Sequence, residues 1–254
     1  MNILITGASS GIGQALAKQY LSLGHALFAC GRNESRLQQL SQYGDVTPLI
    51  FDVNNLQQMR TAIQDLPELD LVILNAGDCE YIKDATKFDG QLFERIVQTN
   101  LVSLGHIIEL VLPKLLASQK QPVLALIGSS VTNLPFSQAE AYGASKAGLA
   151  YLADSLYLDL KPHGIHVCKV SPGFVSTPLT DKNTFEMPFI ISADKAAQRI
   201  VKGLTNYQRH IQFPKRLIWT LKLLSLLPRN WWFKLSNQAK RSTTDMTSGN
   251  GIKS

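Results

Sequence analysis

The stretch EAYGASKAG, residues 140–148, holds a phenol and an amine at a spacing that suits proton transfer. Tyr142 and Lys146 are four positions apart, so a helix would place both side chains on one face. A tyrosine titrates near pH ~10 in water, and a nearby ammonium favours the phenolate and lowers that pKa. Tyr142 is therefore a candidate general acid or base, with Lys146 adjusting it. Taken alone, such a pair is also a common coincidence on a helix surface.

Hydroxyl and amide side chains form a second group of candidates. Ser129 and Ser130 end an apolar run, and a serine hydroxyl can orient a substrate carbonyl by a hydrogen bond. The spacing of 13 residues to Tyr142 favours Ser129 and leaves Ser130 as the alternative. Asn100 lies inside the apolar helical segment FERIVQTNLVSLGHII, where a buried amide must be hydrogen-bonded. A structural and a catalytic role for Asn100 both remain open.

These residues need a scaffold, and the hydrophobic pattern predicts one. Short apolar runs of β type alternate with longer helical patterns, which favours a parallel sheet covered on both faces. The right-handed crossover rule then predicts a doubly wound α/β fold with seven mostly parallel strands. Strands are expected at 3–6, 25–30, 46–53, 69–77, 122–129, 165–173 and 210–214, and helices at 11–23, 34–42, 55–65, 89–118, 140–161 and 193–206.

The first strand runs into a glycine-rich loop, TGASSGIG, at residues 6–13. Glycines there allow a tight turn and let the backbone approach a pyrophosphate at the N-terminus of the next helix. The spacing is G-x-x-x-G-x-G, which differs from the common G-x-G-x-x-G fingerprint, so an ordinary strand–helix turn is the alternative. The candidate cofactor-binding residues of this loop are Gly7, Ser9, Ser10, Gly11, Ile12 and Gly13.

The second strand ends in ACGRN, which bears on the choice of nucleotide. An NAD site usually has an acidic residue here for the ribose 2′-hydroxyl, but Gly31 and Arg32 occupy the place. The planar guanidinium of Arg32 suits a 2′-phosphate, so NADP is favoured and NAD stays open. The alternative for Arg32 is an ordinary surface arginine at the start of a helix.

Two further strand ends fall on the edge where open α/β sheets bind ligands. The third strand ends in FDV, and Asp52 there can accept a hydrogen bond from an adenine amine, with Val53 beside it. The fourth ends in NAG, whose Asn75, Ala76 and Gly77 let the backbone pass close to a ribose. Each of these residues alone is also common in turns.

Together the motifs resemble the short-chain dehydrogenase/reductase family. TGASSGIG, NAG, Asn100, the set from Ser129 to Tyr142-Gly-Ala-Ser-Lys146, and SPGFVSTP (171–178) occur in the family's order over about residues 2–214. The resemblance implies a single Rossmann-type domain that moves a hydride between NAD(P) and a carbonyl or alcohol. It implies that Tyr142 exchanges the proton and that Lys146 binds the nicotinamide ribose and lowers the tyrosine pKa. Ser129 would orient the carbonyl oxygen, and Asn100 would hold a water. It also implies nicotinamide contacts by Pro172, Gly173, Val175 and Thr177.

The resemblance leads to a functional hypothesis. We expect an NADP-dependent reductase of a lipophilic ketone or aldehyde, because the segment between Thr177 and the helix at 193–206 is short and would leave the substrate pocket open. The alternatives are an alcohol dehydrogenase working in the oxidative direction and a nucleotide-sensing protein without turnover. Cys30, Cys79 and Cys168 lack the spacing of a zinc site or a redox dithiol, so no metal is expected.

The C-terminal part differs in charge from the rest of the chain. Residues 1–198 hold 14 Lys and Arg against 18 Asp and Glu, whereas residues 199–254 hold 11 against 1. This asymmetry argues against a nucleic-acid-binding body and favours an anionic partner for the end of the chain, with a solvated basic tail as the alternative. We predict a catalytic domain over 1–214, an apolar and basic extension over 215–235, and a disordered polar tail over 236–254.

The extension at 215–235 has two interpretations. Its uninterrupted apolar part, 217–227, is too short to span a bilayer, but Trp231, Trp232 and Phe233 beside Arg229 and Lys234 suit a headgroup interface. Alternatively, it makes a subunit contact in a homo-oligomer or covers the substrate pocket. The sparse cysteines and the lack of a secretory signal at the N-terminus lead us to expect a cytoplasmic location, with membrane association on the cytoplasmic face left open.

Overall fold

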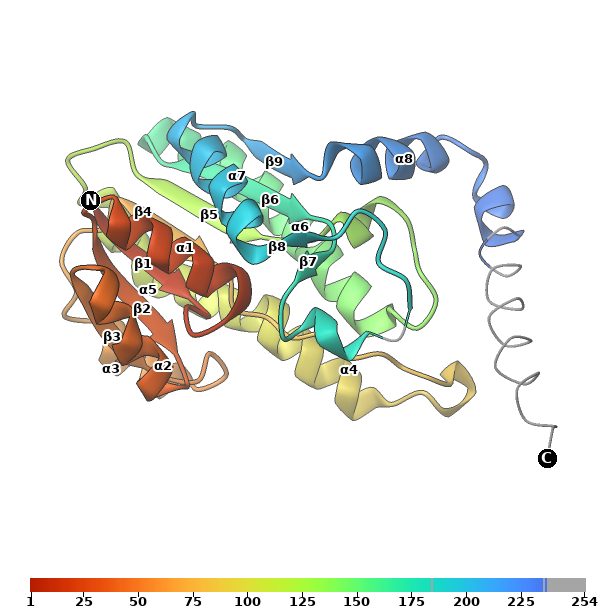
Figure 1. The fold of residues 1–254 in the computed structure, drawn as a ribbon, viewed down its shortest axis with the longest axis horizontal. Helices are drawn as coiled ribbons and strands as arrows, with labels where there is room; N and C mark the ends of the chain where they lie inside the picture. The colour runs from red at the N-terminus through yellow and green to blue at the C-terminus, as the bar shows by residue number, and fades with distance from the viewer. Residues whose placement is uncertain (184, 235, 237–254) are drawn as a thin grey trace.

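The computed structural model describes residues 1–183, 185–234 and 236, and it contains the predicted doubly wound sheet (Figure 1). The seven strands follow the order β3-β2-β1-β4-β5-β6-β9, and every pairing between neighbours is parallel. The strand order reverses between β1 and β4, which is the topological switch point where such sheets bind ligands. The strands are β1 (Asn2–Thr6), β2 (Ala26–Gly31), β3 (Val46–Ile50), β4 (Leu71–Leu74), β5 (Val123–Ile127), β6 (His166–Pro172) and β9 (His210–Phe213).

Helices cover both faces of the sheet. One face carries α1 (Gly11–Ser22), α2 (Glu34–Gln38) and α7 (Ala193–Thr205), and the other carries α3 (Leu56–Ile63), α5 (Ser103–Leu116) and α6 (Glu140–Leu160). Short 3-10 turns join these elements at Gln39–Tyr43, Ala85–Lys87, Ser130–Asn133, Lys161–His163 and Thr180–Lys182. The two-sided cover explains why the strands read as continuous apolar runs.

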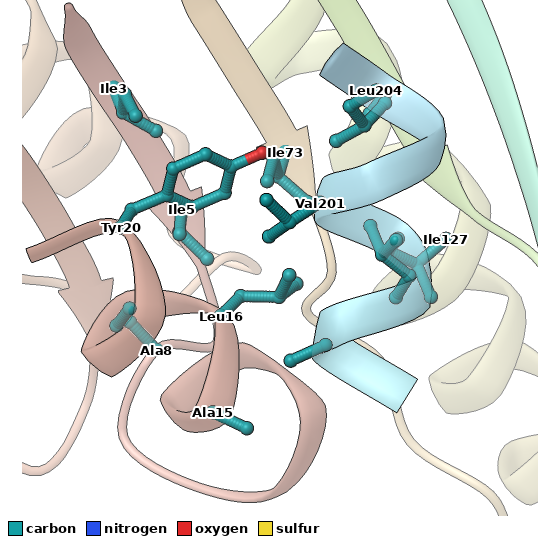
Figure 2. Close-up of a cluster of buried hydrophobic side chains, with 14 of the residues drawn as sticks. Ile3, Ile5, Ala8, Ala15, Leu16, Tyr20, Ile73, Ile127, Val201 and Leu204 are labelled. Carbon is teal, nitrogen blue, oxygen red and sulfur yellow. The ribbon is translucent and has the colours of Figure 1, made fainter. Parts of the chain in front are cut away.

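Alternate residues of each strand supply the two halves of the core. In β1, Ile3 and Ile5 point into the layer beneath α1 and α7, whereas Leu4 points into the layer beneath α3 and α5. Figure 2 shows Leu16 and Tyr20 of α1 facing Val201 and Leu204 of α7, in one cluster with Ile3, Ile5 and Ile73 of the sheet. Burying a side chain of this size contributes roughly 1.5–3 kcal/mol. This packing fixes the start of α1 over the carboxyl ends of β1 and β4.

The predicted helix at 89–118 is confirmed as one helical stretch, Gly90–Leu116, with a π-helical turn inside it. It consists of α4 (Gly90–Val97), a π-helical turn (Gln98–Val102) and α5, and Asn100 lies in the wide turn. Within the described residues, the stretch from Gly90 to Leu116 is long and apolar enough to cross a membrane by length and composition. In the fold, Leu104, Ile107 and Val111 of this stretch are buried against the sheet. Its apolar character is therefore explained by the core.

Two elements near the C-terminus were not predicted. A small parallel ribbon pairs β7 (Val175–Ser176) with β8 (Ile191–Ser192), and its strands are too short to leave a periodic pattern. Helix α8 (Lys215–Ser225) starts directly after β9 and extends beyond the end of the sheet (Figure 1). From residue 237 onward, the predicted disordered tail lies outside the described residues.

Candidate active site

A cleft of about 490 Å³ opens at the carboxyl edge of β1, β4 and β5. Nearly all predicted site residues line it, although they come from segments spread over most of the chain. Asn100 and Gly13 are the exceptions and lie behind its wall. The predicted residues at the cleft are Gly7, Ser9, Ser10, Gly11, Ile12, Arg32, Asp52, Val53, Asn75, Ala76, Gly77, Ser129, Tyr142, Lys146, Pro172, Gly173, Val175 and Thr177.

The glycines of the first loop are required for three different steric reasons. Gly7 and Gly11 adopt φ of +67° and +55°, the left-handed region that disfavours residues with a Cβ. A Cβ on Gly11 would also come within 3.1 Å of the Thr177 methyl group, so the loop lies close to the opposite rim. A Cβ on Gly13 would overlap the Gly7 carbonyl oxygen. Gly13 therefore permits the close approach of α1 to β1 and does not face the cleft.

The loop is held in place by the side chains of Thr6, at the end of β1, and Asn75, directly after β4. The hydroxyl oxygen of Thr6 accepts hydrogen bonds from the backbone N–H groups of Asn75, at 2.9 Å, and Ala76, at 3.0 Å. The amide of Asn75 donates back to the carbonyl oxygens of Thr6 and Gly7. These bonds join the NAG segment to the glycine loop across the switch point and preorganise both.

The start of α1 fits an anionic group. The helix begins at Gly11 with no acidic residue in its first turn, and its cap, Ser10, makes no side-chain capping bond. The first backbone N–H groups of the helix therefore keep their donors for a ligand, and the helix dipole adds positive potential. A cleft with positive-φ glycines at its floor and these donors at its wall fits the pyrophosphate of a dinucleotide.

Arg32 and Asp52 lie at the far end of the cleft from Tyr142, where β2 and β3 end. Arg32 Nη1 is 3.7 Å from Asp52 Oδ2, and the Arg32 side chain is 79% exposed. The other oxygen of Asp52 accepts a hydrogen bond from the Asn54 backbone at 2.9 Å. An exposed ion pair at this distance is weak, so the guanidinium can reorient towards a phosphate.

Tyr142 and Ser129 meet at the end of the cleft away from Arg32. Ser129 caps the 3-10 turn that follows β5: its Oγ accepts a hydrogen bond from the Val131 N–H at 3.2 Å. Its side chain is also hydrogen-bonded to Tyr142. Ser130 is buried and does not line the cleft. The structure thus places Ser129, of the two serines, beside the phenol.

Lys146 follows one turn after Tyr142 on α6 and is almost fully buried. Its Nζ donates to the Ile127 carbonyl oxygen at 3.0 Å and lies 5.8 Å from the centre of the Tyr142 ring. Burial disfavours the ammonium and lowers the pKa of Lys146 to about 8. The amine is therefore held at the cleft floor between the ends of β4 and β5.

The pKa of Tyr142 corrects one expectation. The sequence predicts that Lys146 lowers it, but burial raises the pKa of Tyr142 to about 12 in this structure. An electrostatic interaction with Cys79 adds to the rise, and the hydrogen bond to Ser129 opposes it. Desolvation of the phenolate is the largest cause of the rise.

Asn100 acts on the site through other residues. It is fully buried in the π turn, its Oδ1 accepts from the Asp78 N–H at 2.8 Å, and its Nδ2 donates to the Asp78 carbonyl oxygen at 2.8 Å. The same Nδ2 donates to Ser145 Oγ at 3.0 Å, and Ser145 in turn donates to the Tyr142 carbonyl oxygen. Asn100 therefore ties the segment after NAG to the helix that carries Tyr142.

Several cleft residues escaped the sequence analysis. Thr180 is the clearest, because its hydroxyl donates to the Val175 carbonyl oxygen and accepts from the Thr177 N–H, which shapes the rim over the glycine loop. It lies two residues after SPGFVSTP, so its position could have suggested it. The carbonyl oxygen of Ile127 has no such signal, since any residue could supply it. The other unpredicted lining residues are Gly31, Phe51, Asn54, Asp78, Thr99, Gly128, Pro178 and Leu179.

Comparisons with known proteins agree with this geometry. A family model described as short chain dehydrogenase matches residues 1–187. An uncharacterized oxidoreductase of Myxococcus xanthus is 32% identical over 234 residues, covering 89% of this chain and 92% of that protein. A probable NADP-dependent dehydrogenase of Haemophilus influenzae is 33% identical and covers 67% of this chain and 69% of its own. A solved short-chain dehydrogenase from Sphingobium yanoikuyae, in complex with NADPH, superimposes with a TM-score of 0.76 at 24% identity, covering 96% of this chain and 95% of that chain.

Proposed function

The chain belongs to the short-chain dehydrogenase/reductase family, and we propose that it is an NADP(H)-dependent reductase of a lipophilic ketone or aldehyde. The observation that carries the proposal is the convergence of Ser129, Tyr142 and Lys146 on one end of a cleft whose other end carries Arg32. A protein that only senses a nucleotide has no need for a phenol and a serine hydroxyl hydrogen-bonded to each other at the catalytic end.

The residues of the cleft fit NADP(H) along its length. The glycine loop and the start of α1 would hold the pyrophosphate, and Arg32 would hold the 2′-phosphate. No acidic side chain stands where β2 ends, which is the place that favours NAD. Lys146 would bind the nicotinamide ribose, and the Pro172–Thr177 segment would meet the nicotinamide itself. The NADP(H) named for the Haemophilus and Sphingobium proteins supports the same choice.

In the reaction, what the reduced cofactor supplies is a hydride to the carbonyl carbon of the substrate. Ser129 would donate a hydrogen bond to the carbonyl oxygen and orient it. Tyr142 would donate its phenolic proton to that oxygen, which completes the alcohol and leaves a phenolate. Lys146, one helical turn away, would stabilise the phenolate until a proton from solvent restores the phenol.

The protonation state of Tyr142 suits the donation of a proton to a carbonyl oxygen. With a pKa of about 12, the phenol keeps its proton throughout the neutral range and is ready to donate it. Oxidation of an alcohol would begin with the phenolate, which burial disfavours. The phenol is the form that a carbonyl reduction consumes, and the reverse reaction would use the same residue as a phenolate.

Apolar side chains pack close to Tyr142, which supports a lipophilic substrate. Tyr142 packs beside buried Ile82 and Ile96. Nearby, the Phe185 ring makes edge contacts with Tyr81 and Phe174, with centroids 5.9 and 6.0 Å apart. An alkyl chain placed among such groups gains up to about 0.8 kcal/mol for each CH₂ it buries.

A chain-length series tests the proposal. NADPH oxidation would be followed with methyl ketones and straight-chain aldehydes of 4 to about 12 carbons. We expect kcat/KM to rise with each added CH₂, by up to about fourfold per group, until the apolar surface is filled. A preference for short, hydrophilic ketones would contradict the lipophilic assignment, and turnover with NADH alone would contradict the cofactor assignment.

A further inference from the structure

Helix α8 carries apolar side chains on two opposite faces. Its inner face buries Leu217, Ile218 and Leu221. Its outer face leaves Trp219, Leu223 and Leu226 exposed, at 71%, 69% and 81% of their surface. At 100° per residue these three lie within about 60° of one another, on the side away from the buried stripe. The helix therefore has two apolar faces and no single amphipathic stripe.

The helical turn after α8 adds further exposed aromatic groups. Trp231 and Phe233 are 62% and 47% exposed. Between them, Trp232 Nε1 donates to the Pro135 carbonyl oxygen at 2.8 Å, and its ring stands edge-on to Phe136 at 5.7 Å. This anchor holds the turn against the body of the protein. We call the exposed side chains of Trp219, Leu223, Leu226, Trp231 and Phe233 the C-terminal apolar surface.

Within the described residues 215–234, every charged side chain is a cation. Lys215, Arg216, Lys222, Arg229 and Lys234 are all exposed on the same segment. Along the chain, no acidic residue occurs between Asp194 and Asp245. The partner of this surface must therefore offer apolar area and negative charge together.

We propose that the C-terminal apolar surface docks on a lipid bilayer that contains anionic headgroups. Tryptophan and phenylalanine beside arginine and lysine suit the boundary between headgroups and acyl chains, and each cation near an anionic surface adds attraction. The 11 residues of α8 would extend about 16 Å, roughly half the hydrocarbon core, so the helix lies in the interface and does not span it.

A second copy of the chain fits this surface less well. A two-fold contact places the same patch of both subunits face to face. Five cations of one copy would then oppose the same five of the other, with no acidic residue on the segment to balance them. An anionic bilayer satisfies the same apolar groups and attracts the cations.

The inner face of α8 connects the docking surface to the catalytic end of the cleft. Leu217 and Leu221 pack with Leu134 and Phe174, and a Cβ on Gly173 would run into the Leu217 side chain. Docking would thus place a bilayer against the outer face of α8, whose inner face packs on Leu134, five residues after Ser129. Docking itself needs neither substrate nor cofactor, so it can be tested whether or not the proposed reductase activity is found.

The test uses the full-length protein and vesicles of known composition. All three tryptophans of the chain lie in this segment, at positions 219, 231 and 232, so intrinsic tryptophan emission reports only on it. Vesicles of phosphatidylcholine with 30% phosphatidylglycerol should bind the protein in a sedimentation assay and shift the emission to shorter wavelength. Vesicles of phosphatidylcholine alone should bind it at least tenfold more weakly.

Variants on exposed positions separate the apolar and the charged contributions. The triple variant Trp219→Gln, Leu223→Gln, Leu226→Gln should weaken binding to the anionic vesicles at least tenfold. The double variant Arg216→Gln, Lys222→Gln should weaken it about 30-fold, since one cation near the surface is worth about fivefold in affinity. The matched control, Leu23→Gln with Leu116→Gln, removes exposed leucines on other elements and should leave binding unchanged.

Three outcomes would overturn the proposal. The first is no binding of the wild type to the anionic vesicles. The second is equal binding of the wild type and the triple variant. If changing Lys240, Arg241 and Lys253 to Gln then removed all binding, the attraction would be assigned to those three cations and not to the C-terminal apolar surface. The third is a dimer in sedimentation velocity that the triple variant dissociates while vesicles bind neither protein, which would assign the surface to a second copy.

Discussion

The clearest consequence of the site concerns the arginine at its nucleotide end. Replacing Arg32 with alanine removes the guanidinium that we assign to the 2′-phosphate. In the free protein this side chain makes one weak contact, at 3.7 Å to Asp52, and is 79% exposed. An exposed pair of this kind contributes at most about 1 kcal/mol, so the variant should fold with nearly unchanged stability.

The effect on cofactor binding should be much larger than the effect on stability. A hydrogen bond to a charged group is worth about 1.5–3 kcal/mol, which corresponds to roughly a 10- to 150-fold change in dissociation constant. NADH lacks the 2′-phosphate, so its dissociation constant should change by no more than about twofold. The Arg32→Ala variant should therefore lose most of its preference for NADPH over NADH.

Titration calorimetry with both nucleotides measures this preference directly. Arg36→Ala is the matched control, because Arg36 is an exposed arginine of α2 that does not line the cleft. It should leave both dissociation constants within about twofold of the wild type. Equal losses for NADPH and NADH in Arg32→Ala, or a loss of the same size in Arg36→Ala, would refute the assignment of the 2′-phosphate to Arg32.

Two further predictions follow from steric contacts and from burial. Gly13→Ala should lower the melting temperature by several degrees and weaken NADPH binding at least tenfold, because its Cβ would overlap the Gly7 carbonyl oxygen. The control Gly105→Ala, which has open space around it, should change neither quantity. Similar thermal melts for the two variants would contradict this account. The folded pKa of Lys146, about 8, lies below the usual 10.5, so the unfolded chain binds more protons between these values and stability should rise with pH there. Denaturant titrations from pH 7 to 10.5 should show the wild type gaining about 3 kcal/mol relative to Lys146→Met, and parallel pH profiles would disprove the burial of the charge.

Much of the fold was predictable because its signals are local. All seven strands occur where apolar runs end at turn residues, and the confirmed parallel sheet follows from their alternation with helices. The strand ends also bring the glycine loop, NAG and Ser129 to one edge, since the carboxyl ends of parallel strands share it. Tyr142 and Lys146 reach the same cleft because one helical turn separates them.

The features that escaped prediction depend on distant parts of the chain. The π turn at Asn100 leaves the hydrophobic period of 89–118 nearly unchanged, and its bonds to Asp78 and Ser145 join segments 22 and 45 residues away. The raised pKa of Tyr142 comes from burial, which the spacing to Lys146 does not report. The inner face of α8 is recognisable only once Leu134 and Phe174 are seen to pack on it.

The central claim is that Tyr142 donates the proton in a carbonyl reduction, and Tyr142→Phe tests it most directly. This change removes one hydroxyl and leaves the ring in its packing with Ile82 and Ile96. With the best ketone of the chain-length series, kcat should fall by at least about 10²-fold, the usual worth of a general acid, while the NADPH dissociation constant stays within about twofold of the wild type. A variant that binds NADPH normally and reduces the ketone at the wild-type rate would contradict the account.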